Sequence, residues 1–205
     1  MGDPRRPEGP RTGRLIASVA RLRARLAVVL ARRRVSIGFV LFPLVAWLAA
    51  PKASTVLVGA PIAAAGEAIR VWAAGHLRKN REVTASGPYR WVAHPLYVGS
   101  SVMAVGLAIG SGSWAAASLI GAYVAVTIGA AVSHEETGLR SRFGDRYDRY
   151  RSGEETGDGE TGRRFSLAQA MRNREYRAVV GLALALLLLA LKATYNQMFG
   201  GRPGG

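Results

Sequence analysis

A polar, aromatic-rich turn interrupts the apolar part of the chain at residues 87–99, which read Gly-Pro-Tyr-Arg-Trp-Val-Ala-His-Pro-Leu-Tyr-Val-Gly. A second polar cluster, residues 134–136, reads His-Glu-Glu. Irregular backbone at membrane depth is tolerated only where protein buries it or where it lines a cavity. Aromatic rings, histidines and carboxylates suit a ligand that has an aromatic base, hydroxyls and a cationic centre. These two segments are therefore the first candidates for a binding site.

Other common chemistries find little support in the residue pattern. The chain has no Cys, which excludes thiol catalysis. It has no Walker loop, no GxGxxG motif between a strand and a helix, and no nucleophile elbow. His76, His94 and His134 show no short metal-ligand spacing, so we expect no metal site.

The elements that must position these residues are apolar helices. The chain has 205 residues, of which 49% are apolar, and a formal net charge of +15. The basic residues alternate with long uncharged runs, which indicates membrane topology and argues against a nucleic-acid partner. A span takes about 20 mostly apolar residues. We therefore predict an all-α, polytopic membrane protein with about five transmembrane helices, at residues 35–50, 54–75, 95–112, 113–133 and 176–198.

The distribution of arginines predicts the orientation. Residues 1–34 combine a basic disordered tail with an amphipathic interfacial helix, on which arginines at 14, 21, 25 and 32 form a stripe that would meet anionic lipid headgroups. Basic residues collect on the cytoplasmic side of membranes. We expect the amino terminus, the 76–93 loop and the 134–175 segment inside, with the carboxyl terminus on the opposite side.

Two ionisable residues fall within the second span. Glu67 and Arg70 lie three residues apart and so share a helix face. Charged groups in a span are costly and usually face a bundle interior or a cavity. The pair is either a neutralising structural contact or part of a substrate pocket, to which Arg90 would also contribute.

The transmembrane domain is expected to cover residues 35–205, with a motif core at 66–151. The four residues 110–113 leave room only for a tight antiparallel turn between the third and fourth spans. That hairpin brings the two polar clusters to the same end of the bundle. A flexible acidic loop at 152–165 and a short polar helix near 166–175 precede the last span.

The order of these motifs resembles a family of integral membrane enzymes, the isoprenylcysteine carboxyl methyltransferase and phospholipid methyltransferase superfamily. The resemblance covers about residues 66–151. It rests on Gly87-Pro88-Tyr89-Arg90, on His94-Pro95-Leu96-Tyr97-Val98-Gly99 and, one hairpin later, on Glu135-Glu136 with Leu139, Phe143-Gly144, Tyr147 and Tyr150.

The resemblance implies that S-adenosylmethionine binds at the cytoplasmic end and that a lipophilic methyl acceptor, a membrane lipid or a lipidated small molecule, enters from the membrane. The cofactor-binding residues that it implies are Arg81, Glu82, Val83, Thr84, Tyr89, His94, Pro95, Leu96, Tyr97 and Glu135. Methyl transfer from a sulfonium depends mainly on alignment and exclusion of water. An amine or hydroxyl acceptor also needs a proton acceptor, for which Glu136 and His134 are the candidates.

Two positions depart from the family pattern. Ala93 stands where the family usually has Arg before the His-Pro pair, and Ala131 stands where isoprenylcysteine enzymes carry a substrate-coordinating Arg. Two other functions remain open. One is an NADPH-dependent membrane reductase of the sterol-reductase type, for which the arginines at 140, 142 and 146 could hold a phosphate. The other is a non-catalytic membrane scaffold.

Overall fold

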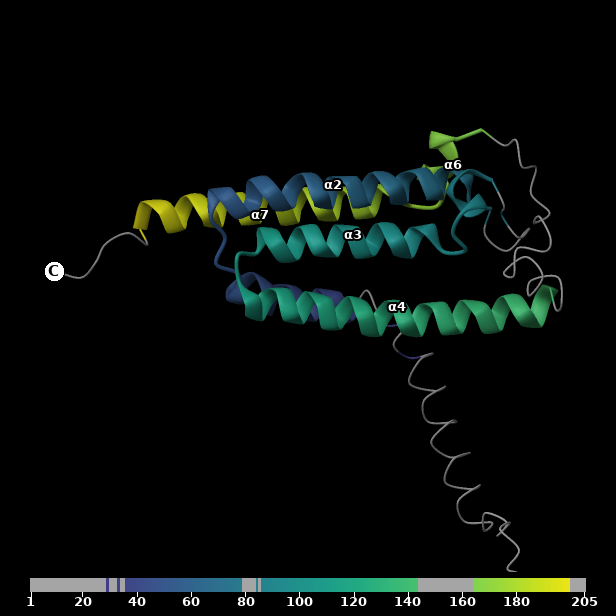
Figure 1. Cartoon of the computed structure of the whole chain (residues 1–205), viewed down its shortest axis with the longest axis horizontal. Helices are drawn as coiled ribbons and strands as arrows, with labels where there is room; N and C mark the ends of the chain where they lie inside the picture. The colour runs from purple at the N-terminus through teal and green to yellow at the C-terminus, as the bar shows by residue number, and fades with distance from the viewer. Residues whose placement is uncertain are drawn as a thin grey trace, which may run out of the picture.

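Helices make up the regular structure of the described chain. The computed structural model describes residues 29, 33, 36–78, 84, 86–143 and 164–199, with the backbone alone over 133–143. The elements are α2 (Ala53–His76), the short 3-10 helix η1 (Gly87–Arg90), α3 (Pro95–Gly110), α4 (Trp114–Phe143), α6 (Leu167–Arg172) and α7 (Tyr176–Phe199). A further helix, Ser36–Leu48, precedes α2. The predicted all-α fold is confirmed (Figure 1).

Three helices are long and apolar enough to cross a membrane: α2, the Trp114–Val132 part of α4, and α7. The helices Ser36–Leu48 and Pro95–Gly110 are apolar but shorter. The 16 residues of α3 rise about 24 Å, less than the roughly 30 Å of a bilayer core. All five predicted spans are thus helices, and three of them reach the length of a span. The chain is an all-α membrane protein.

α2 and α3 approach each other closely through glycines. A Cβ added to Gly66 would lie 2.6 Å from the carbonyl oxygen of Gly99, and one added to Gly99 would lie 2.7 Å from that of Gly66. Two helical turns further along α3, a Cβ added to Gly106 would lie 2.6 Å from the carbonyl oxygen of Gly59. Because lipid tails are as apolar as side chains, helices in a membrane gain from such close backbone contact. Gly99 and Gly106 of α3 therefore face α2.

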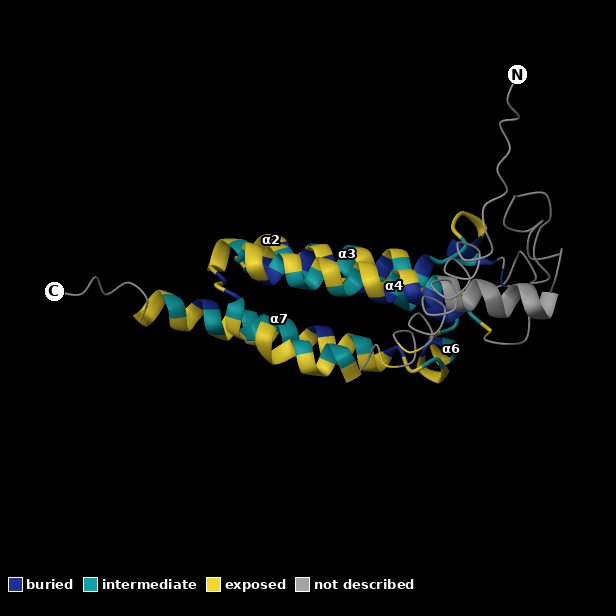
Figure 2. Cartoon of the chain, turned by 90° about the horizontal axis from the view of Figure 1, so that it is seen from below, coloured by how far each residue is buried: buried dark blue, intermediate teal, exposed yellow. Residues whose placement is uncertain are grey.

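The remaining helices pack around this pair. α7 packs on α2, while α4 lies along α3 (Figure 1). Figure 2 shows exposed positions along the outer faces of α2, α3 and α7, and the side chains there are mostly apolar, including Leu57, Val58, Leu184 and Leu187. Such faces suit lipid and not water.

At one end of the bundle, two polar side chains of α7 donate hydrogen bonds to backbone carbonyls of the first described helix and of the connection that follows it. Lys192 Nζ donates to the carbonyl oxygens of Ala46 (2.7 Å) and Trp47 (3.1 Å), near the end of the helix Ser36–Leu48. Asn196 Nδ2 donates to Pro51 O at 3.3 Å. The Lys192 contacts satisfy carbonyls that have no partner within the helix at its C-terminal end, and the Asn196 contact holds the connection to α2.

At the other end, α6 caps α2. Asn173 Nδ2 donates to Ala74 O (2.7 Å) and to Leu77 O (2.9 Å), and Gln169 Nε2 donates to Leu77 O (2.9 Å). The backbone N–H of Ser166 donates to Gly75 O at 3.3 Å. The last turn of α2 would otherwise leave these carbonyls without partners. The segment before α7 is thus attached firmly to the end of α2.

Some predicted elements lie outside the described residues. These are the amphipathic helix of the N-terminal segment, apart from the isolated residues Val29 and Arg33, and the acidic loop over residues 152–163.

Candidate active site

The Gly-Pro-Tyr turn forms η1 at the end of α2. Gly87 has φ +58, a left-handed conformation that favours glycine because it has no Cβ. Pro88 follows at the start of η1, and its carbonyl accepts from the N–H groups of Trp91 and Val92, both at 3.2 Å. Pro88 and Tyr89 are buried. The sequence Gly-Pro therefore builds a tight turn that directs Tyr89 into the protein.

His76, the last residue of α2, lies directly beneath this turn. A Cβ added to Gly87 would come within 2.7 Å of its imidazole ring. The ring is also 6.1 Å from that of Phe165, centroid to centroid. Its Nδ1 lies 3.0 Å from Trp72 O, which as a carbonyl oxygen can only accept, so Nδ1 carries the proton. The His76 ring therefore packs against the backbone of the turn at Gly87.

The His-Pro-Leu-Tyr element begins α3. His94 is the residue before the first turn, and Pro95 occupies the first position, where its missing N–H costs nothing. The N–H groups of Tyr97 and Val98 donate to His94 O at 3.0 and 3.2 Å. The ring centroids of His94 and Tyr97 are 5.7 Å apart. Both side chains are half-buried, so the start of α3 presents two neighbouring aromatic rings.

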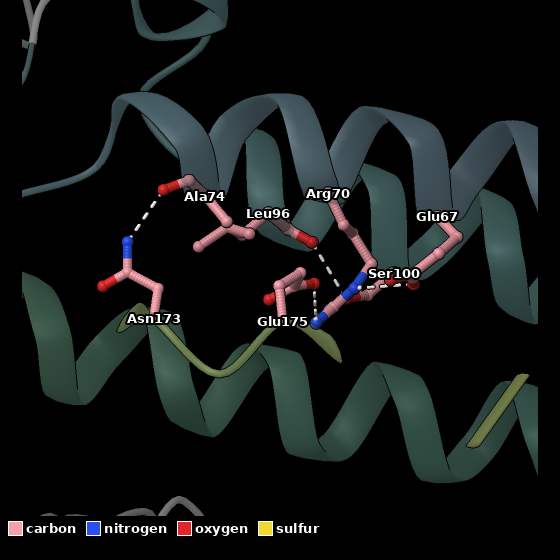
Figure 3. A network of polar contacts seen from close by, with 7 residues as sticks. All are labelled: Glu67, Arg70, Ala74, Leu96, Ser100, Asn173 and Glu175. Carbon is pink, nitrogen blue, oxygen red and sulfur yellow. Dashed lines mark hydrogen bonds and ion pairs between the residues drawn. The ribbon is translucent and has the colours of Figure 1, made fainter. Parts of the chain in front are cut away.

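Arg70 lies at the centre of a polar network that joins three segments of the chain (Figure 3). Its Nε lies 3.2 Å from Glu67 Oε2, within α2, and its Nη2 lies 2.6 Å from Glu175 Oε1, just before α7. Nη1 donates to Ser100 Oγ in α3, and that hydroxyl donates to Leu96 O at 2.8 Å. Both carboxylates are buried. Two carboxylates therefore share one guanidinium, whose positive charge they compensate.

The third part of the site is the extension of α4. α3 has 16 residues and α4 runs antiparallel to it, so α4 passes Pro95 near Gly129. At a rise of 1.5 Å per residue, residues 134–136 lie about 9 Å beyond that level. Figure 1 shows the end of α4 at the same end of the bundle as the start of α3. The backbone thus brings His134, Glu135 and Glu136 to the end of the bundle at which α3 begins, as predicted. Their side chains lie outside the described structure.

Not every predicted residue belongs to one cluster. Tyr89, His94, Pro95, Leu96 and Tyr97 lie in η1 and at the start of α3, and Thr84 is buried. Arg90 is exposed and forms no ion pair with a described residue, unlike Glu67 and Arg70. The predicted residues Arg81, Glu82 and Val83 lie outside the described residues.

Sequence reasoning missed three residues of this end. Ser100 and Glu175 complete the Arg70 network. Ser86 is fully buried, and its Oγ has no hydrogen-bond partner among the described residues. The one signal in the sequence was the position of Glu175, an acidic residue directly before an apolar span. Neither serine stands out from its neighbours in the sequence.

The fold and the candidate site define the class of protein: a helical membrane protein with polar and aromatic residues gathered at one end of its bundle. Residues 54–146 match the family model of phospholipid methyltransferases. That family is part of the group of membrane methyltransferases that includes the isoprenylcysteine carboxyl methyltransferases, so the match confirms the resemblance over these residues. The match supports the function of a membrane methyltransferase that acts on lipid. Searches of curated proteins and of solved structures found no significant match.

Proposed function

We propose that the protein transfers a methyl group from S-adenosylmethionine to a lipophilic acceptor at the cytoplasmic face of a membrane. One observation carries the proposal. The Gly-Pro-Tyr turn and the His-Pro-Leu-Tyr start of α3 meet at one end of the bundle, inside the segment that matches the methyltransferase family. The amino terminus would lie on the same side as this end, and the carboxyl terminus on the opposite side.

The residues of this end suit S-adenosylmethionine. The buried Ser86 Oγ has no partner among the described residues, so it is available to bind a polar group of the ligand. The neighbouring rings of His94 and Tyr97 would hold the adenine base by stacking, and Glu135 would accept from ribose hydroxyls. When bound, S-adenosylmethionine supplies an activated methyl group on a sulfonium.

The chain's own residues would align the acceptor and exclude water. Apolar outer faces admit a lipid tail from the bilayer, while Tyr89 and Pro95 are buried beside the site. Alignment and desolvation are the main requirements of methyl transfer. If the acceptor is an amine or a hydroxyl, Glu136 or His134 would take its proton.

The polar network favours an acceptor that carries no negative charge. Arg70 already contacts Glu67, Glu175 and Ser100, and two carboxylates compensate its charge, so it is a poor partner for a carboxylate of a substrate. Ala131 stands where isoprenylcysteine enzymes carry an arginine for that purpose, and Arg90 is exposed. We therefore expect an amine or a hydroxyl of a lipid, in preference to a prenylcysteine carboxylate.

Calorimetry on the detergent-purified full chain tests this function. We expect S-adenosylmethionine to bind with micromolar affinity. Glu135→Ala and Tyr97→Ala should each weaken binding at least tenfold, and Tyr195→Ala, at the far end of α7, should leave it unchanged. A companion assay measures transfer of a labelled methyl group to extracted lipids. Binding of NADPH alone would instead establish a reductase, and binding of neither ligand would establish a scaffold.

A further inference from the structure

The connection between the site and the last span carries an unusual surface. Residues 164–177 contain four arginines, Arg164, Arg172, Arg174 and Arg177, and all four are exposed. None of them forms an ion pair with a described residue. The one acidic residue in this range, Glu175, is buried against Arg70. Every exposed charge of the connection is therefore positive.

Apolar side chains lie among these arginines. Leu167 is 62% exposed and Met171 is 54% exposed, although both belong to a helix that attaches its other side to α2. On that other side, Ala170 is buried and Gln169 donates to Leu77 O. The exposed side of α6 thus carries two large apolar residues and one arginine, Arg172. Apolar and basic side chains exposed together suit the boundary between headgroups and acyl chains.

Residues 164–177 lie at the level that we expect for the surface of a bilayer. α7 begins at Tyr176 and is a candidate span, so residues 164–175 lie where the chain enters the membrane. Figure 1 shows α6 at the end of α2 and α7. The opposite end differs. Its described cations are Lys52 and Lys192, and Lys192 is engaged by two carbonyl oxygens. Among the described residues, only the end that carries α6 thus offers several unpaired cations to a bilayer.

We propose that residues 164–177 form a docking surface for anionic phospholipid headgroups of the bilayer. The arginines bind headgroup phosphates, and Leu167 and Met171 insert beside the acyl chains. Since Gln169, Asn173 and the Ser166 backbone attach this connection to the end of α2, the surface is preformed and needs little ordering on binding. It is separate from the predicted N-terminal anchor and independent of the methyl acceptor.

Native mass spectrometry of the full chain in detergent, titrated with phosphatidylglycerol or phosphatidylcholine, tests this surface. The variant Arg172→Gln/Arg174→Gln/Arg177→Gln should bind phosphatidylglycerol about 100-fold more weakly, because each arginine near an anionic surface contributes close to a factor of five. Phosphatidylcholine binding should stay the same. The matching Lys substitutions keep the charge and should retain binding within a few-fold.

Two control variants decide the location of the surface, and a competition with inorganic phosphate decides the ligand. Lys52→Gln removes an exposed cation from the opposite end and should have no effect. The matched variant Arg21→Gln/Arg25→Gln/Arg32→Gln removes three arginines from the N-terminal segment. If it abolishes phosphatidylglycerol binding while the 172/174/177 variant retains it, the proposal is wrong. Displacement of the lipid by millimolar inorganic phosphate would also overturn it, since the surface would then be a simple phosphate site.

Discussion

Arg70 of α2 and Glu175, which precedes α7, form an ion pair with an N–O distance of 2.6 Å. The pair joins the second predicted span to the start of the last one (Figure 3). Glu67 and Ser100 complete the coordination of the guanidinium. The same arginine therefore links α2, α3 and the start of α7.

Removal of Arg70 should destabilise the protein strongly. Arg70→Ala leaves two buried carboxylates without a cation, which typically costs about 3 kcal/mol. Glu175→Gln should cost clearly less, because the remaining Arg70–Glu67 pair is neutral and the amide oxygen still accepts. Thermal unfolding in detergent measures both. Equal losses for the two variants would mean that the shared guanidinium is not what stabilises the network.

The glycine contact between α2 and α3 should not accept a methyl group. Gly66→Ala places a Cβ 2.6 Å from Gly99 O and forces the helices apart, at a cost of about 1–3 kcal/mol. Gly121→Ala is the matched control in α4, because nothing lies within 4 Å of a Cβ there. We expect a lower melting temperature for the first variant and no decrease for the second, since Ala favours a helix over Gly.

The cap that α6 provides should contribute measurably to stability. Asn173→Ala leaves Ala74 O without a partner and removes one of the two donors to Leu77 O, at a cost of about 1–2 kcal/mol. It should also make the chain near Arg164 more susceptible to limited proteolysis. Asn196→Ala removes a single longer bond, at 3.3 Å, at the opposite end and should leave that cleavage unchanged. Unaltered cleavage in Asn173→Ala would show that the cap does not attach this segment.

Gly87 should be critical for cofactor binding. Gly87→Ala combines a left-handed backbone with a Cβ 2.7 Å from the His76 ring, so the turn must shift. We expect at least a tenfold loss of S-adenosylmethionine affinity by calorimetry. Gly112→Ala also alters a left-handed glycine, at φ +62, in the turn between α3 and α4. This variant should lower stability without changing the affinity of the folded protein for S-adenosylmethionine. Equal affinities for the two variants would show that Gly87 does not support cofactor binding.

Much of the architecture follows from local sequence. Long apolar runs and the residues that interrupt them predict helices close to those observed, because a helix in lipid satisfies its own backbone and needs no partner to form. The tight turn at Gly87-Pro88 and the start of α3 at His94-Pro95 are equally local, since Gly and Pro restrict or release their own dihedral angles. These elements also contain the motif on which the family resemblance rests.

The tertiary structure alone decided which of these elements meet. The spacing of Glu67 and Arg70 predicts a pair, but neither Ser100 nor Glu175 carries a periodic signal that would assign it to Arg70. The contacts of His76 with the Gly87 turn and of Asn173 with α2 are equally hidden in the sequence. Helix formation depends on near neighbours along the chain, whereas these contacts depend on the angle and depth at which whole helices pack, which glycines such as Gly66 and Gly99 permit.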